Sequence, residues 1–233
     1  MAYIQTPDGK FHYKTRALYP GVKPIEKEKA LENLLLLKDI LDAHGISFML
    51  SYGTLLGAVR EHDFITHDED IDLTIKDEYR QKFLSILPLL KEKGLELVRY
   101  DRRGLYSLMK DGEYIDLYFF VREPDGIWEC SGNLIPDSFM REPEPIEFKG
   151  HTFMTHSDYM GMIRCEYGEN WQTPCCFCEF GMPVHKRMLF FMKEKLKDIL
   201  PDFIYMPLAN RCSRRLRGIC MKHIEDYRHR INS

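Results

Sequence analysis

The stretch YGTLLGAVREHDFITHDEDIDL, residues 52–73, ends in four closely spaced acidic residues that lead directly into an apolar segment. In an extended chain successive side chains face opposite sides, so Asp70 and Asp72 project together while Ile71 and Leu73 face the core. Two parallel carboxylates repel each other and raise each other's pKa unless a cation lies between them. A solvated acidic turn is the alternative interpretation, but acids that alternate with Ile and Leu favour a strand that carries a site.

A third carboxylate, Asp116, lies within EYIDLYFF (113–120), which has the composition of a buried strand. A charge in such a strand is costly unless it has a partner. Carboxylate and phosphate oxygens are the ligands of Mg²⁺. The sequence therefore predicts a catalytic metal site at Asp70, Asp72 and Asp116 for Mg²⁺, with Mn²⁺ as an alternative. Whether Asp116 is a metal ligand or a general base stays open.

A glycine turn precedes the acidic stretch. Tyr52, Gly53 and Thr54 end an apolar segment predicted as a strand (46–52) and begin a short predicted helix (53–60). Glycine permits close backbone approach, and free amides at a helix start favour an anion. We expect these residues to bind the phosphates of a donor, although a glycine that only makes a turn is the simpler alternative.

Five further side chains are candidates for ligand binding. Arg60 ends the short helix and could hold a phosphate in bidentate fashion, or be an ordinary surface arginine. His67 adjoins the acids and could contact donor or metal, or hydrogen-bond within its loop. Lys110 flanks a predicted hairpin before the third acid. Trp171, with Tyr167, offers a flat face to a sugar, a base or a choline-like cation, or packs in the core.

The pattern along the chain predicts an α/β (α+β) protein, with a mixed β-sheet core flanked by helices and a mostly helical C-terminal extension. We expect one domain over residues 1–233, with a catalytic core at 26–122 and a hairpin and helical extension at 123–233. Ser157 is expected to cap a helix, and Pro88 to bend one. Predicted helices cover 26–45, 77–93, 157–167, 185–200 and the basic stretch 211–230; predicted strands cover 71–75, 95–100, 105–110 and 113–120, with hairpin turns at 111–112 and 149–150.

Composition indicates an ordinary globular protein, with 44% hydrophobic, 12% aromatic and 30% charged residues. The chain has 33 lysines and arginines and 36 acidic residues, so it lacks the excess of positive charge that is typical of a nucleic-acid-binding protein. The N-terminus lacks the pattern of a signal peptide, and no apolar run approaches the roughly 20 residues of a membrane span. We therefore expect a cytoplasmic protein without a nucleic-acid partner.

The C-terminal third contains two features whose interpretation stays open. Cys165, Cys175, Cys176 and Cys178 could hold zinc, but they lack paired C-x-x-C spacing, and buried free thiols are the alternative. The basic C-terminal helix carries Leu208, Cys212, Leu216, Ile219 and Ile224 along one side. It could contact the inner face of a membrane peripherally, or pack through its apolar residues as a terminal helix.

Residues 52–73 closely resemble the signature of the LicD family, the phosphocholine-transferase group related to fukutin and fukutin-related protein. The resemblance continues through EYIDLYFF and through YGENWQTP (167–174), and covers roughly residues 30–174. His67 stands where the family usually has Trp, and Glu69 where it has Asp, so we expect altered donor contacts rather than lost metal binding. The resemblance implies a nucleotidyltransferase fold and transfer of a phospho-substituent from a CDP-alcohol to a sugar hydroxyl.

The leading prediction is therefore a Mg²⁺-dependent phosphotransferase of the phosphocholine-transferase type. It would move phosphocholine or ribitol phosphate from CDP-choline or CDP-ribitol to a glycan or lipid-linked glycan, in the modification of cell-surface polysaccharide, lipopolysaccharide or teichoic acid. One alternative is a nucleotidyltransferase that moves NMP from an NTP to a small molecule or protein. Another is a nucleotide-binding scaffold without turnover.

Overall fold

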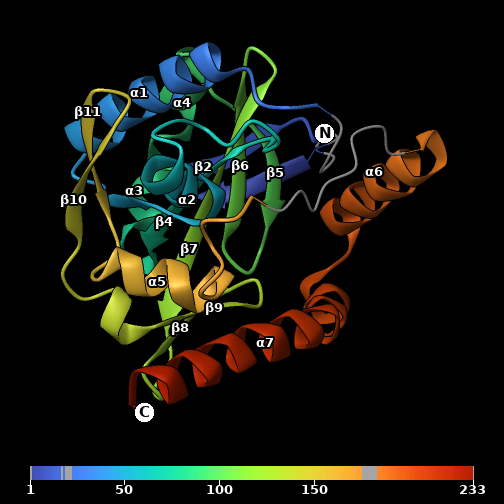
Figure 1. Cartoon of the computed structure of the whole chain (residues 1–233). Helices are drawn as coiled ribbons and strands as arrows, with labels where there is room; N and C mark the ends of the chain where they lie inside the picture. Colours follow the sequence, from blue (N-terminus) through green and yellow to red (C-terminus); the bar gives the residue numbers. More distant parts are fainter. Residues whose placement is uncertain (1, 17, 19–22, 175–182, 233) are drawn as a thin grey trace.

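The computed structural model describes residues 2–16, 18, 23–174 and 183–232 of the 233-residue chain. Its centre is a mixed sheet in the order β10-β11-β3-β4-β7-β6-β5, and β8 and β9 extend it from β7 (Figure 1). Two neighbouring pairs, β11 with β3 and β4 with β7, are parallel, and the others are antiparallel. The strands are β3 (Phe48–Leu50), β4 (Ile71–Lys76), β5 (Glu96–Asp101), β6 (Leu105–Lys110), β7 (Glu113–Arg122), β8 (Ile127–Cys130), β9 (Asn133–Pro136), β10 (Glu144–Phe148) and β11 (His151–Thr155).

Helices surround this sheet and continue beyond it, as predicted for the C-terminal part. Helix α7 packs against α5 and β9, whereas α6 stands at the edge of the molecule, where it contacts the edge strand β5 (Figure 1). None of the helices within the described ranges is long and apolar enough to span a membrane. The helices are α1 (Lys27–Ala43), α2 (Tyr52–Arg60), α3 (Arg80–Ser85), α4 (Leu87–Glu92), α5 (Tyr159–Tyr167), α6 (Val184–Ile199) and α7 (Asp202–Asn232), with 3-10 turns at Asp77–Tyr79 and Asp137–Phe139.

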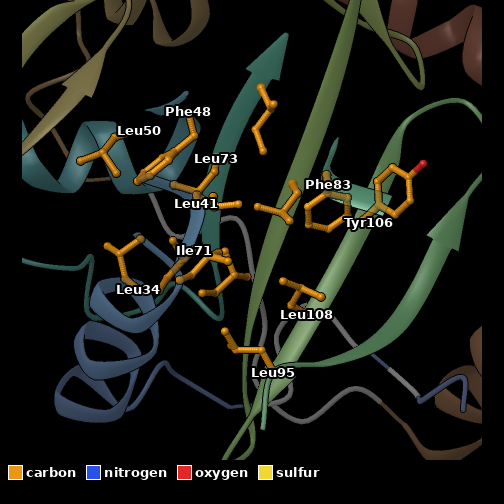
Figure 2. Close-up of a cluster of buried hydrophobic side chains, with 14 of the residues drawn as sticks. Leu34, Leu41, Phe48, Leu50, Ile71, Leu73, Phe83, Leu95, Tyr106 and Leu108 are labelled. Atoms are coloured by element: carbon orange, nitrogen blue, oxygen red, sulfur yellow. The ribbon is translucent and has the colours of Figure 1, made fainter. Parts of the chain in front are cut away.

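Helix α1 and the central strands form the main core. The side chains of Leu34 and Leu41 in α1 are fully buried. Figure 2 shows these two leucines beside Ile71 and Leu73 of β4. The alternation that turns Ile71 and Leu73 toward the helix turns the intervening Asp72 to the opposite face of the sheet, so packing of the core positions the acids.

The predicted helix 77–93 is broken into a 3-10 turn and two short helices, α3 and α4. Pro88 lies in the first turn of α4, where its missing N–H needs no partner. A continuous helix would place the proline ring against the carbonyl of Leu84. The predicted irregularity at Pro88 is therefore confirmed, and Phe83 and Leu90 remain buried on either side of the break.

The predicted cap of α5 was wrong by one residue. Asp158 is the N-cap, and its Oδ1 accepts a hydrogen bond of 3.0 Å from the Gly161 amide. The Ser157 hydroxyl instead accepts from the Glu142 amide and donates to the Glu142 carbonyl, at 2.8 and 2.6 Å. Ser157 is thus used to join two loops, which leaves the capping position to Asp158.

The alternative in which the C-terminal helix packs through its apolar side holds at Ile224, but the other four of the five residues named for it are exposed. Helix α7 buries a stripe that includes Tyr205, Ala209 and Ile224, whereas Leu208 and Leu216 are exposed. The side chain of Arg103 supports this orientation, because its guanidinium donates to the Ala209 carbonyl at 3.0 Å and also to Ser213. These polar contacts and the apolar packing of Cys220 and Ile224 together hold this side of α7 against the fold.

Hairpin turns follow the local sequence closely. Both predicted turns, Asp111-Gly112 and Lys149-Gly150, have positive φ at both central residues, as type I′ turns require. Two further hairpins with two-residue turns were not predicted. One joins β8 to β9 through Ser131-Gly132, and the other joins β1 (Ala2–Thr6) to β2 (Gly9–Tyr13) at the N-terminus.

Candidate active site

The three predicted carboxylates meet on one face of the sheet. Strands β4 and β7 are adjacent and parallel, and their register places Asp72 directly opposite Asp116. Asp70 precedes Asp72 by two residues and points the same way. One carboxylate oxygen of each residue lies within 4.8 Å of the others. Asp72 and Asp116 are buried, at 8% and 2% exposure, so the charges are held together away from bulk water.

This arrangement is electrostatically unfavourable without a cation. Burial raises the pKa of Asp70 well above its ordinary value, and the charges of Asp72 and Asp116 raise it further. Burial likewise raises the pKa of Asp72, with added repulsion from Asp68 and Asp116. Three convergent carboxylate oxygens are the donor set that a hard divalent cation takes. The residues present therefore fit Mg²⁺ or Mn²⁺.

Asp116 has its own fixed partners, which the sequence analysis missed. The guanidinium of Arg99 on β5 forms an ion pair with Asp116 Oδ2. Ser107 on β6 donates to Asp116 Oδ1 at 2.5 Å and accepts from Arg99 Nε at 2.8 Å. The three residues lie in register across neighbouring strands. An arginine inside the apolar strand that contains LELVRY was the signal available in the sequence.

The glycine turn supports Asp72. Its carboxylate accepts hydrogen bonds from the Gly53 amide and the Tyr118 hydroxyl, which partly oppose the rise in its pKa. The backbone N–H of Asp72 donates to Thr54 Oγ1 at 2.9 Å. Thr54 is buried and braces β4 from the start of α2. Binding of phosphate by Tyr52, Gly53 and Thr54 remains a prediction.

Position 53 requires glycine because the Asp68 carboxylate approaches it closely, and not because of its φ angle. A Cβ atom at this position would lie 2.1 Å from Asp68 Oδ2, far inside contact distance. Asp68 lines the neighbouring cleft, and burial raises its pKa. The absence of a side chain at Gly53 thus lets a fourth acid pack against the start of α2.

A cleft of about 770 Å³ opens beside the acids, a size typical of a small-molecule site. Three parts of the chain form its walls: α2 with the acidic loop, α5 with the loop after it, and α7. The α7 wall and Glu166 were not predicted, because the sequence gives no local sign that α7 returns to the catalytic core. The polar and aromatic lining residues include Tyr52, Arg60, His67, Asp68, Asp72, Glu166, Tyr167, Trp171, His223, Asp226 and Arg230.

The structure brings most of the predicted ligand-binding residues to this cleft. Arg60 is no surface arginine: its guanidinium donates to the Trp171 carbonyl at 3.2 Å and pairs with Glu61 at 2.8 Å. His67 and Trp171 also line the cleft. Lys110 is not among the described lining residues, and its amine pairs with Asp111 in the hairpin turn.

The zinc hypothesis can be followed only at Cys165. This thiol is buried in an apolar cluster that includes Cys130 and Cys220, and burial raises its pKa to about 12. A thiol with a raised pKa favours the protonated form rather than a metal-binding thiolate. Cys175, Cys176 and Cys178 lie outside the described residues, so zinc stays a prediction there.

Glu166 is a half-buried acid in the cleft wall, and desolvation raises its pKa from 4.5 to about 7. The folded state therefore holds this proton more tightly than the unfolded state, and the stability it contributes is lost as the pH rises from 4.5 to 7. We expect Glu166→Gln to raise the free energy of unfolding by up to about 3 kcal/mol above pH 7, and by much less at pH 5.

Thermal denaturation of wild type and variant at pH 5, 6, 7 and 8 measures this effect. Glu225→Gln is the matched control, because Glu225 is exposed on α7. Its melting temperature should follow wild type at every pH. A constant difference between Glu166→Gln and wild type across this range would contradict the proposed cause.

The family profile and the curated relatives point to the same protein family. The sequence profile described as LicD/FKTN/FKRP, nucleotidyltransferase domain, matches residues 45–180. An uncharacterised protein of Rickettsia typhi is 31% identical over 132 residues, which are 55% of this chain and 41% of that protein. The human ribitol-5-phosphate transferase FKTN is 28% identical over 163 residues, which are 64% of this chain and 34% of FKTN.

Among solved structures, the antibiotic-resistance factor ANT(2'')-Ia superimposes with a TM-score of 0.47 and 14% identity, over 88% of this chain and 98% of that chain. This chain spans about two fifths of the length of the Rickettsia protein and about one third of FKTN. The family profile covers more than half of this chain, and the matched segment contains all three carboxylates. The chain therefore belongs to the LicD/FKTN/FKRP family, through its nucleotidyltransferase domain.

Proposed function

We propose that this chain is a Mg²⁺-dependent phosphotransferase that moves a phospho-alcohol from a CDP-alcohol to a glycan hydroxyl. The observation that carries the proposal is the convergence of Asp70, Asp72 and Asp116 within 4.8 Å beside a cleft large enough for a nucleotide. Family membership and similarity to a protein named ribitol-5-phosphate transferase support this type of transfer. Phosphocholine and ribitol phosphate are the proposed transferred groups.

In this proposal Asp70, Asp72 and Asp116 hold the divalent ion. When bound, Mg²⁺ would offset the negative charge of both the carboxylates and the donor's diphosphate. Arg99 and Ser107 fix the orientation of Asp116. Both Asp116 oxygens already accept hydrogen bonds, one from Arg99 and one from Ser107, so we assign Asp116 as a ligand rather than as the general base.

Another acid is then needed to take the proton from the attacking hydroxyl. Glu166 lines the cleft, and its pKa of about 7 suits a general base at neutral pH. Arg60 and His67 lie on the α2 side of the cleft and are proposed to contact the donor. Trp171 offers an aromatic face to a base or a sugar. The glycan acceptor, free or lipid-linked, would approach between these walls.

The alternative function is transfer of NMP from an NTP, which the nucleotidyltransferase description of the family favours. Both reactions would use the same carboxylates, but they release different products. Transfer from a CDP-alcohol releases CMP, whereas nucleotidyl transfer releases pyrophosphate. Product identity therefore separates the two functions.

The test is a thermal-shift panel of CDP-choline, CDP-ribitol, nucleoside triphosphates and sugar nucleotides, each with Mg²⁺ or with EDTA. At saturation we expect a CDP-alcohol to raise the melting temperature by roughly 5 °C, only with Mg²⁺. Asp70→Asn should lose this shift. Asp42→Asn, an exposed acid of α1, is the matched control and should keep it.

Hydrolysis and transfer products are then measured with the ligands that bind. CMP release would support the proposal, and pyrophosphate release from an NTP would support the alternative. Donor binding without turnover with any acceptor would indicate a scaffold. A shift that Asp70→Asn leaves unchanged would contradict the site itself.

A further inference from the structure

Helix α6 exposes most of its described apolar side chains to solvent. No described residue of α6 is buried, and its large apolar residues continue onto the first turns of α7. Exposed apolar clusters of this kind mark interaction sites. We define the α6 apolar surface as Val184, Met188, Leu189, Met192, Leu196, Ile199, Phe203, Ile204 and Leu208, which are between 39% and 78% exposed.

The helix is held to the fold by polar groups instead. Asp198 accepts a hydrogen bond of 2.9 Å from the Tyr13 hydroxyl and another from Thr15. The Lys197 carbonyl accepts from Arg102 at 3.0 Å. A helix of a globular core normally turns its apolar face inward and its polar face outward. Helix α6 buries no apolar face within its described residues, and it lies at the edge of the molecule (Figure 1), so its apolar side chains are left for an external partner.

Charge distinguishes between the partners that could cover this face. Residues 184–217 contain nine Lys or Arg against three Asp or Glu, whereas the whole chain contains 33 against 36. Exposed arginines at the start of α7, including Arg211, Arg214 and Arg215, belong to this basic segment. A second copy of the chain would bring two positive segments together, which opposes self-association. An anionic surface would be attracted.

We propose that the α6 apolar surface and the arginines Arg211, Arg214 and Arg215 form a docking surface for an anionic lipid bilayer. The apolar side chains would enter the headgroup and acyl boundary with α6 in the plane of the membrane, and the arginines would contact lipid phosphates. This surface is separate from the cleft and does not depend on the proposed transferase activity. From the sequence, a membrane contact was considered through the C-terminal helix alone, whereas this proposal places the contact on α6 and the first part of α7.

Vesicle flotation of the full chain tests the proposal. We expect wild type to float with vesicles of phosphatidylcholine and phosphatidylglycerol, to float weakly with phosphatidylcholine alone, and to be released by high salt. Met192→Glu with Leu196→Glu should lower the vesicle partition coefficient at least about tenfold. Arg214→Glu with Arg215→Glu should lower it roughly fivefold or more for the anionic vesicles only.

The control is Met154→Glu, since Met154 is 41% exposed on β11, on the side of the molecule opposite α6 in Figure 1. It should bind vesicles like wild type. None of these residues lines the cleft, so the melting temperature and any turnover of a soluble substrate should stay unchanged in every variant.

Three results would overturn the proposal. One is the absence of vesicle binding by wild type, and the second is equal binding by wild type and both double variants. The third is concentration-dependent dimerisation of wild type that Met192→Glu with Leu196→Glu abolishes, which would make the surface an interface between copies of the chain. All three are independent of the transferase assay.

Discussion

Asp72→Asn is expected to abolish turnover while making the metal-free protein more stable. The variant removes one of three clustered carboxylates, two of them buried, whose mutual repulsion raises the pKa of Asp70 and Asp72. Asparagine keeps an oxygen that can accept from the Gly53 amide and Tyr118. We expect kcat/KM to fall at least about a hundredfold. The melting temperature in EDTA should rise by roughly 3 °C, near 1 kcal/mol.

Adding Mg²⁺ separates this explanation from a general change in stability. Wild type should gain stability with Mg²⁺, and Asp72→Asn should gain little. Asp42→Asn, at an exposed position of α1, should match wild type with and without the metal. Retention of turnover by Asp72→Asn, or equal stabilisation of both proteins by Mg²⁺, would count against a metal site at these acids.

Arg99→Met is expected to be strongly destabilising. Among the described residues, Arg99 is the cation that pairs with buried Asp116. Its loss leaves the negative charge of Asp116 without a positive partner, next to the carboxylates of Asp70 and Asp72. Removing one partner of a buried pair typically costs about 3–5 kcal/mol, or a fall of roughly 10 °C in melting temperature here. Denaturant unfolding in EDTA measures the loss, and turnover should fall with it.

A double variant distinguishes the charge pair from simple packing. Arg99→Met with Asp116→Asn leaves no unpaired charge and keeps an oxygen for the Ser107 hydroxyl. It should recover most of the stability lost by Arg99→Met and should remain inactive, because a proposed metal ligand is gone. Equal stability of the single and double variants would show that Arg99 acts through its volume rather than through its charge.

Local sequence patterns predicted the three acidic residues of the site. The pairing of β7 with β4 and β6, and of β6 with β5, then brought the remaining residues to them. Alternation with Ile71 and Leu73 was enough to place Asp70 and Asp72 on one face, because side-chain direction in a strand is a local property. Arg99 and Ser107 became partners of Asp116 only through the register of β5, β6 and β7. The predicted Asp111-Gly112 turn sets Ser107 opposite Asp116, but the pairing of β5 with β6, which brings Arg99 to them, was not predicted.

The errors in the fold have similar causes. The packing face of α7 depends in part on the contacts of Arg103 with Ala209 and Ser213, residues more than a hundred positions away along the chain. The β8 and β9 hairpin carried a local signal in Ser131-Gly132 that the sequence analysis did not use. The two predicted hairpins had equally local signals and were confirmed, since two-residue turns depend mainly on their own φ angles.

Helix α7 runs without interruption from Leu208 of the α6 apolar surface to His223 at the cleft. Fifteen residues of helix span about 22 Å, and this length cannot stretch or shorten as a linker would. If both proposals hold, the helix acts as a rigid spacer between membrane and reaction centre. Only a hydroxyl that a lipid-borne chain carries at the matching height would be modified, so acceptor length would be selected by geometry before any chemical contact is made.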